Sequence, residues 1–230
     1  MEEQIVVIIP AFNEENAVGK VVRDIPKNLT DEVIVVNNNS TDKTSEVARE
    51  EGATVLFERE KGYGNACLKG IDYLNKERKN KTDIVVFIDA DYSDYPEQMN
   101  QLVQPILDDQ ADMVIGSRAL GKRDRGSMTF PQVFGNWLAT SMMKLFYGAS
   151  FTDLGPFRAI RYSSLLELGM QDKTYGWTVE MQIKAIKKKL RYLEVPVDYR
   201  NRIGFSKISG TIKGTLMAGY KIIFTIFKYL

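Results

Sequence analysis

Short apolar runs alternate with helical patterns over the first half of the chain. The apolar runs are rich in β-branched residues and end in polar or turn residues, which is typical of buried strands. They predict strands at residues 5–10, 32–37, 54–58, 84–89 and 113–117. The stretches between them have helical periodicity and predict helices at residues 15–24, 42–51, 64–76 and 97–109. We expect Ser40 or Thr41 to cap the second of these helices and Pro96 to occupy the first turn of the last.

The pattern changes after residue 118. A basic, glycine-containing loop over 119–130 precedes an apolar helix at 132–147, and a later helix, strand and loop are expected at 178–189, 192–197 and 198–209. No internal repeat or low-complexity linker separates these segments. The alternation of strands and helices predicts the α/β class, with a mostly parallel central sheet flanked by helices. In such a sheet the ligand site lies at the carboxyl ends of the strands.

The last seventeen residues, from Gly214 to Leu230, form an apolar segment with a single basic stripe. On a helix, Lys213, Lys221 and Lys228 lie on one side and large apolar residues cover the rest. This pattern predicts an amphipathic helix in a membrane interface; a helix packed on the domain or in an oligomer contact is the alternative. We therefore divide the chain into a domain at 1–208 and a terminal helix at 209–230. Neither a membrane-spanning segment nor a signal peptide is expected.

Composition narrows the chemistry. The chain has 230 residues, of which 44% are hydrophobic and 27% are charged, and it has no histidine. Any site therefore uses carboxylates, hydroxyls, backbone groups, lysine, arginine or a metal held by oxygen, because histidine-based triads and zinc sites are excluded. The single cysteine, Cys67, favours a reducing, cytoplasmic location. The net charge of +1 combines −8 over residues 1–183 with +9 over residues 184–230, which predicts an anionic partner for the basic part.

The strongest chemical signal is Asp89-Ala90-Asp91 at the end of the apolar run 84–88. In extended backbone, residues two apart point to the same side, so both carboxylates face one ligand. Hard oxygen donors at a strand end suit Mg²⁺ or Mn²⁺ bound to a diphosphate. The alternative is a turn in which an aspartate merely caps the strand end.

Three further loops follow predicted strands or precede helices. Residues 10–14 leave the first strand with the sequence Pro-Ala-Phe-Asn-Glu, and residues 37–42 close the second with three asparagines. The amide of Asn37 both donates and accepts hydrogen bonds, as recognition of a base edge requires. Residues 61–66 are rich in glycine, and Gly64 allows close approach to a phosphate or sugar. Each loop also has an ordinary explanation as a strand–helix connection.

Taken together and in this order, these motifs resemble those of the family 2 glycosyltransferases with the GT-A fold, and especially the branch that transfers mannose or glucose to polyprenyl (dolichyl) phosphate. The resemblance continues through residues 116–118, 152–158, 176–180, 194–197 and 202–207. It therefore covers nearly the whole chain. It implies that residues 1–208 form a Rossmann-like GT-A domain.

The resemblance also implies roles for individual residues. Nucleotide-sugar binding is implied for Pro10, Ala11, Asn13, Glu14, Asn37, Asn39, Gly64, Asp89, Ala90, Asp91, Arg202, Ser206 and Lys207. Asp89 and Asp91 would hold the metal, and Arg118, with Arg125 or Gln132, would face the acceptor phosphate. The implied partners are a nucleotide-sugar donor, a polyprenyl phosphate and the cytoplasmic face of a membrane, and nothing points to a nucleic acid. The family's Asp-Asp-Gly-Ser is here Asn-Asn-Asn-Ser, so the sequence leaves the donor base open.

The acceptor determines whether a general base is needed. A polyprenyl phosphate is already an anionic nucleophile, so positioning and electrostatics suffice for an inverting displacement. A hydroxyl acceptor would need a carboxylate base, and Asp153 and Glu180 are the candidates. Asp91 and Arg118 complete the set of residues predicted to act in catalysis. A non-catalytic, membrane-associated binding protein is the third possibility that the sequence leaves open, and the oligomeric state is not predicted.

Overall fold

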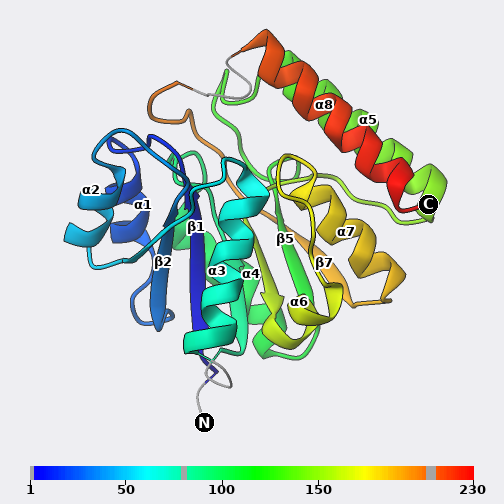
Figure 1. Cartoon of the computed structure of the whole chain (residues 1–230). Helices are drawn as coiled ribbons and strands as arrows, with labels where there is room; N and C mark the ends of the chain where they lie inside the picture. The colour runs from blue at the N-terminus through cyan, green and yellow to red at the C-terminus, as the bar shows by residue number, and fades with distance from the viewer. Residues whose placement is uncertain (1–2, 79–81, 206–210) are drawn as a thin grey trace.

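A computed structural model describes residues 3–78, 82–205 and 211–230 of the chain (Figure 1). Seven strands form one sheet in the order β3-β2-β1-β4-β6-β5-β7. The strands are β1 (Ile5–Ala11), β2 (Glu32–Asn37), β3 (Thr54–Phe57), β4 (Ile84–Phe87), β5 (Met113–Ser117), β6 (Arg158–Arg161) and β7 (Tyr192–Pro196). All neighbouring pairs are parallel except those of β6, which runs antiparallel to both β4 and β5. The predicted α/β fold with a mostly parallel sheet is confirmed.

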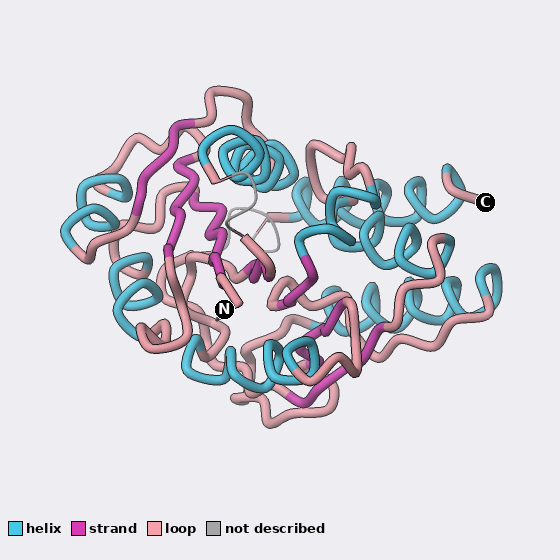
Figure 2. The backbone as a smooth tube through the Cα atoms, turned by 90° about the horizontal axis from the view of Figure 1, so that it is seen from below, coloured by secondary structure: helices cyan, strands magenta, loops and turns pink. Residues whose placement is uncertain are grey.

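Helices cover both faces of this sheet, as the view from below shows (Figure 2). The helices are α1 (Val18–Asp24), α2 (Thr44–Glu50), α3 (Tyr63–Glu77), α4 (Met99–Leu107), α5 (Phe130–Tyr147), α6 (Tyr162–Leu168), α7 (Trp177–Lys187) and α8 (Ile212–Lys228). A short 3-10 turn, η1 (Pro96–Gln98), leads into α4, so Pro96 occupies a first turn as predicted. Within the described residues, no helix is long and apolar enough to cross a membrane.

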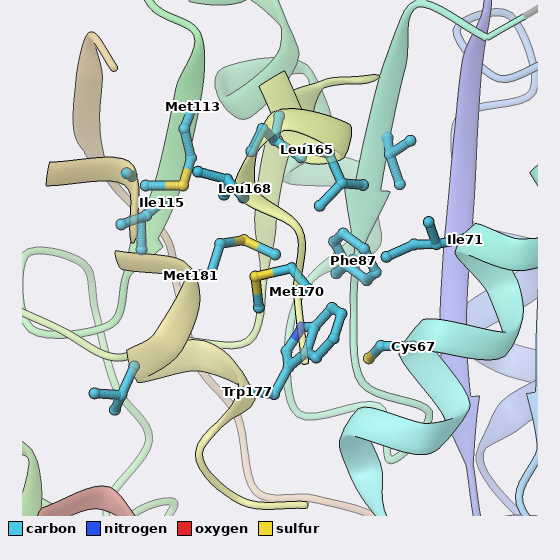
Figure 3. Packing of buried hydrophobic residues seen from close by; sticks show 14 of the residues in the cluster. Cys67, Ile71, Phe87, Met113, Ile115, Leu165, Leu168, Met170, Trp177 and Met181 are labelled. Carbon is cyan, nitrogen blue, oxygen red and sulfur yellow. The ribbon is translucent and has the colours of Figure 1, made fainter. Parts of the chain in front are cut away.

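Alternation along each strand creates two cores. On β1, Val6 and Ile8 face a core shared with α3 and α7, whereas Val7 and Ile9 face a core shared with α1 and α4. This division follows from the two-residue period of a strand. Figure 3 shows the first core, where Trp177 of α7 lies near Cys67 of α3 and Phe87 of β4.

Several details differ from the sequence prediction, among them the first helix, which begins at Val18 rather than at residue 15, and the fourth strand, which ends at Phe87 rather than at residue 89. The second helix begins at Thr44 rather than at residue 42, so neither Ser40 nor Thr41 caps it; the carboxylate of Asp42 accepts a hydrogen bond from the Thr44 N–H instead (3.0 Å). Strand β6 and helix α6 were not predicted. Strand β6 lacks an apolar run because Arg158, at its start, is fully buried and donates to the backbone carbonyls of Leu154, Gly155 and Thr178.

Helices α5 and α8 lie side by side beyond the carboxyl ends of the parallel strands, at the end of the molecule opposite the amino terminus (Figure 1). The Tyr147 hydroxyl of α5 donates to the carbonyl of Ile226 in α8 (2.5 Å). Lys221 of α8 forms an ion pair with Asp172, which precedes α7 (3.0 Å). The terminal helix therefore packs on the domain, and the boundary at residue 208 stays a prediction.

Candidate active site

The carboxylates of Asp89 and Asp91 lie beyond the carboxyl end of β4 and line a cavity of about 610 Å³. The Oδ1 atom of Asp89 is buried and has no hydrogen-bond partner among the described residues. Burial, and next the negative charge of Asp91, raise the pKa of Asp89 to about 7. Asp91 Oδ1 accepts hydrogen bonds from the backbone N–H and the hydroxyl of Ser93. This arrangement fits a divalent cation, because one buried carboxylate oxygen is unsatisfied and both groups are hard oxygen donors.

Arg202 meets these carboxylates from the other half of the chain. Its Nη1 atom lies 3.0 Å from Asp91 Oδ2, and its Nη2 atom lies 2.6 Å from Glu14 Oε1. The structure thus brings together three residues that the sequence assigned to the donor site, from positions far apart in the chain. Ser206 and Lys207, which the sequence assigned to the same loop, lie outside the described residues.

The loops after β1 and β2 bind each other through side-chain amides. Asn13 accepts from the Thr41 N–H (2.8 Å), and its own N–H donates to the Ser40 hydroxyl (2.9 Å). The Asn37 amide accepts from the Ser40 N–H (2.7 Å) and donates to the Ser45 hydroxyl (2.5 Å). These bonds fix the two loops at the edge of the sheet where Pro10 and Ala11 end β1. They also engage both ends of the Asn37 amide, whose role toward a base stays a prediction.

Gly64, in the first turn of α3, is explained by close packing against the backbone at Asp172, which the sequence did not reveal. A Cβ atom on Gly64 would lie 2.0 Å from the carbonyl oxygen of Asp172, so any larger residue would collide with that backbone. The Asn65 N–H donates to the Lys173 carbonyl across the same contact (3.0 Å). Asn39 donates to the Arg59 carbonyl (3.3 Å), and Ala90 is buried between the two carboxylates of the site. The predicted contacts of Gly64, Asn39 and Ala90 with a nucleotide sugar stay predictions.

Arg118 directly follows β5 and lines the cavity. Its Nε and Nη2 atoms and its backbone N–H donate to the Asp153 carboxylate at 2.7 to 2.8 Å. Burial alone would raise the pKa of Asp153, but the charge and hydrogen bonds of Arg118 outweigh it and hold the pKa below its ordinary value. The guanidinium also lies over the Tyr199 ring (5.0 Å to the centroid). Arg118 is part of the described lining of the cavity, whereas Asp153 lines a second, smaller pocket of about 310 Å³.

The other candidate base, Glu180, lies on α7 and is fully buried. Its carboxylate accepts hydrogen bonds from the backbone N–H groups of Gln171 and Asp172, from the Tyr229 hydroxyl (2.6 Å) and from Lys184 (2.8 Å). Burial would raise the pKa of Glu180, but these partners outweigh it and lower the pKa. Glu180 is absent from the described lining of the cavity.

The remaining wall of the cavity comes from loops and helices of the second half of the chain. Gln132 lines it and also accepts hydrogen bonds from the backbone N–H and the hydroxyl of Thr129, which form a cap for α5. Arg125 is exposed and is not part of the described lining. Residues that the sequence did not single out also line the cavity: Tyr63, Ser127, Asn136, Tyr175, Thr178, Tyr199, Asn201, Thr215, Ala218 and Ile222. Three of them were within or beside stretches recognised in the sequence: Tyr63 lies in the glycine-rich loop, Thr178 lies in the stretch 176–180, and Asn201 directly precedes the stretch 202–207.

Comparisons with known proteins agree with this geometry. Residues 6–169 match the family described as Glycosyl transferase family 2. An uncharacterised glycosyltransferase of Mycobacterium tuberculosis is 33% identical over 219 residues, which are 94% of each chain. The undecaprenyl-phosphate mannosyltransferase of Micrococcus luteus is 29% identical over 226 residues, covering 92% of this chain and 90% of that one.

A solved structure supports the fold. The crystal structure of glucosyl-3-phosphoglycerate synthase from Mycobacterium tuberculosis in complex with Mn²⁺, UDP-glucose and phosphoglyceric acid superposes with a TM-score of 0.77. The match covers 99% of this chain and 79% of that chain at 22% identity. The predicted GT-A fold is thereby confirmed.

Proposed function

The chain belongs to glycosyl transferase family 2 and is a glycosyltransferase, and on this premise we propose that it transfers a hexose, such as mannose or glucose, from a nucleoside-diphosphate sugar to a polyprenyl phosphate. The observation that carries the proposal is one cavity with two kinds of lining. Asp89, Asp91, Arg118 and Arg202 supply its charged side chains. Residues of helices α5 and α8 line the same cavity.

The surroundings of the two candidate bases favour a phosphate acceptor over a hydroxyl. The carboxylate of Asp153 accepts hydrogen bonds from Arg118. The carboxylate of Glu180 accepts hydrogen bonds from backbone N–H groups, Tyr229 and Lys184. The pKa of each is below its ordinary value, which makes both weak bases. A phosphate monoester needs no base, because its oxygen already carries the negative charge. Arg118, which is part of the cavity lining, is placed to attract it.

The reaction is then one displacement at the anomeric carbon. A phosphate oxygen of the acceptor forms the new bond as the bond from carbon to the donor diphosphate breaks, so the anomeric configuration inverts. The guanidinium of Arg202 pairs with Asp91 and Glu14 and would stabilise the departing nucleoside diphosphate. Charge placement of this kind provides the catalysis that the sequence predicted without histidine.

Asp89 and Asp91 would hold Mg²⁺ or Mn²⁺, which neutralises negative charge on a diphosphate leaving group when bound. No group of three or more His, Cys, Asp or Glu side chains in the described ranges is arranged for a metal. The protein would therefore supply two carboxylates, and the diphosphate and water would supply the other ligands, as is usual for Mg²⁺. The Mn²⁺ in the complex of glucosyl-3-phosphoglycerate synthase supports this assignment by analogy of fold.

The exposed apolar side chains of α5 and α8, two of the helices that line the cavity, support binding at a membrane surface. Large apolar side chains are exposed on α5, with Phe130 at 80% and Leu145 at 77%, and on α8, with Leu216 at 69%. Of the three lysines in the predicted basic stripe, Lys221 pairs with Asp172, whereas Lys213 and Lys228 are exposed beside the exposed apolar side chains of α8. A lipid acceptor embedded in the cytoplasmic leaflet would reach the cavity between these helices.

A donor panel tests the proposal. Uridine and guanosine diphosphate hexoses are incubated with the protein, Mg²⁺ and undecaprenyl phosphate, and both nucleoside diphosphate release and labelled lipid are measured. We expect one donor to give lipid-dependent release, and the Asp91→Asn variant to lose at least about a hundredfold in rate. Release that a soluble hydroxyl acceptor stimulates and lipid phosphate does not would replace the proposal with the hydroxyl alternative. Absence of any release or donor binding would leave the non-catalytic alternative.

A further inference from the structure

The segment at residues 198–203 lies between two loops of the site and is hydrogen-bonded to both. It runs between the loop at 122–125, beside Arg118, and the loop at 91–95, which carries Asp91. Backbone N–H groups of the segment donate to both loops: Tyr199 to Lys122 O (2.8 Å), Arg200 to Ser93 O (2.9 Å), Asn201 to Asp124 Oδ2 (3.3 Å) and Ile203 to Asp91 O (3.0 Å). The position of this segment therefore sets the position of Arg202 within it.

Arg200 fastens the segment to the loop at 91–95 more strongly than the backbone bonds alone. Its Nε atom donates to the Tyr92 carbonyl (2.8 Å), and its Nη2 atom donates to the Asp94 carbonyl (3.1 Å). The guanidinium also lies between two rings, with Cζ 3.4 Å from the centroid of Tyr92 and 4.1 Å from that of Tyr95. A planar fork that donates to two carbonyls and stacks on aromatic faces is specific to arginine, and lysine does not reproduce it.

The loop at 91–95, which Arg200 contacts, is itself held in place by a contact with α1. The Tyr92 hydroxyl donates to the carboxylate of Asp24, at the end of α1. The backbone of Tyr92 has a φ of 64°, a left-handed conformation that is costly for a tyrosine and persists only when its surroundings hold it. Arg200 is thus connected through Tyr92 to helix α1, the first helix of the domain.

We propose that Arg200 is a positioning residue for Arg202. Arg200 donates to the Tyr92 and Asp94 carbonyls and Arg202 pairs with Asp91, so both side chains face the loop at 91–95. Arg200 holds the backbone, and Arg202 then reaches Asp91 and Glu14. The predicted effect on sugar transfer rests on the function proposed above; the effect on the structure of the segment does not.

Hydrogen exchange tests the structural part without any activity. In the Arg200→Ala variant, we expect the amides of residues 198–203 to exchange about tenfold faster than in the unchanged protein, because their local opening becomes easier. Arg191→Ala is the matched control, since Arg191 is an exposed arginine that pairs with Asp109 and Asp112 at the start of β7. Equal exchange of the segment in the Arg200→Ala and control proteins would overturn the proposal.

A double-mutant cycle tests the positioning part. Turnover of the donor is compared for Arg200→Ala, Arg202→Ala and the double variant. If Arg200 acts through Arg202, kcat falls about tenfold in Arg200→Ala, and the double variant is no slower than Arg202→Ala alone. If the fold-reductions in kcat of the two single variants multiply in the double variant, the coupling between Arg200 and Arg202 is overturned. Arg200→Lys is expected to stay impaired, and full recovery would contradict the role of the guanidinium fork. If no donor is turned over by the unchanged protein, the proposed function fails and hydrogen exchange alone decides the role of Arg200.

Discussion

Arg118 donates three hydrogen bonds to the single carboxylate of Asp153, one from its backbone and two from its guanidinium. Both side chains are nearly inaccessible to solvent, at 11% and 1% exposure. The pair joins the end of β5 to the loop before β6, and it presents one cation to the cavity.

Replacing Asp153 by asparagine should destabilise the protein by about 3 kcal/mol, because a buried guanidinium would lose its counter-charge. Urea unfolding followed by circular dichroism measures this change. Asp109→Asn is the control, since its pairs with Arg161 and Arg191 are exposed and should contribute less than about 1 kcal/mol. Equal, small effects of the two substitutions would contradict the importance of the buried pair.

Glu180→Gln separates a structural role from catalysis. The substitution removes the charge that accepts from Tyr229, Lys184 and two backbone N–H groups, so we expect a loss of about 2 kcal/mol in the free energy of unfolding. The turnover number of the folded variant should stay within about threefold of the unchanged protein. A fall of a hundredfold or more, typical of a lost general base, would reinstate Glu180 as that base.

Asp94 should make stability fall with rising pH in metal-free buffer. Both of its carboxylate oxygens are buried without a hydrogen-bond partner in the described part of the chain, and burial raises its pKa well above the ordinary value. Between the unfolded pKa of about 4 and the raised folded pKa, the folded state holds a proton that the unfolded state has lost. Stability from this group is therefore complete below about pH 4 and declines above it.

The Asp94→Asn variant removes that titration. Its free energy of unfolding, relative to the unchanged protein, should rise with pH from about 4 to 7, by at most about 1.4 kcal/mol per pH unit. Unfolding in urea with a chelator present, repeated across this range, gives the difference. A difference that is independent of pH would show that Asp94 ionises in the folded protein as it does in the unfolded chain.

Binding of Mn²⁺ should strengthen as pH rises through 7. The pKa of Asp89 is raised to about 7, so below that value the carboxyl is largely protonated and must lose its proton to bind a cation. Calorimetric titration of the protein with Mn²⁺ between pH 6 and 8 measures the trend. Asp89→Asn should bind weakly at every pH in this range. Affinity of the unchanged protein that stays constant across it would contradict the assignment of Asp89 as a ligand.

Glutamate at exposed positions of α5 and α8 should weaken binding to vesicles. Burying a leucine in an apolar phase contributes about 2 kcal/mol, so Leu145→Glu and Leu216→Glu should each lower the partition coefficient at least about tenfold. Flotation with vesicles that contain anionic lipid measures this. Leu166→Glu is the control, because Leu166 is also exposed (44%) but lies on α6. Equal loss in all three variants, or a concentration-dependent dimer without vesicles, would assign the apolar surface another role.

The donor half of the site was predictable because its signals are local. A buried parallel strand must end at the ligand edge, so Asp89 and Asp91 followed from an apolar run and a spacing of two residues. Arg202 was found by the resemblance alone, and only folding shows that it meets Glu14 and Asp91. The hydrophobic periodicity of a sequence does not predict a contact between residues so far apart in the chain.

The acceptor half was harder to predict for two physical reasons. Strand β6 carries a buried arginine where a strand pattern requires an apolar residue, and the cost is met by backbone carbonyls that the sequence does not reveal. The sequence offered Asp153 and Glu180 as candidate bases and could not separate that role from a structural one, because their partners come from other elements. The pairing of Lys221 in α8 with Asp172 was likewise not visible in the sequence, because the two residues come from different elements.

The reversed direction of β6 has an evolutionary consequence. The chain leaves the carboxyl edge of the sheet after β5 and returns to that edge to begin β6, the adjacent strand. Everything between Ser117 and Arg158, including α5, is therefore an excursion whose two ends are fixed beside each other. Such an excursion tolerates lengthening or exchange without disturbing the strand order. One scaffold can thus alter the part of the acceptor region that α5 supplies by changing a single contiguous stretch of its gene, while the stretch that encodes the donor loops stays intact.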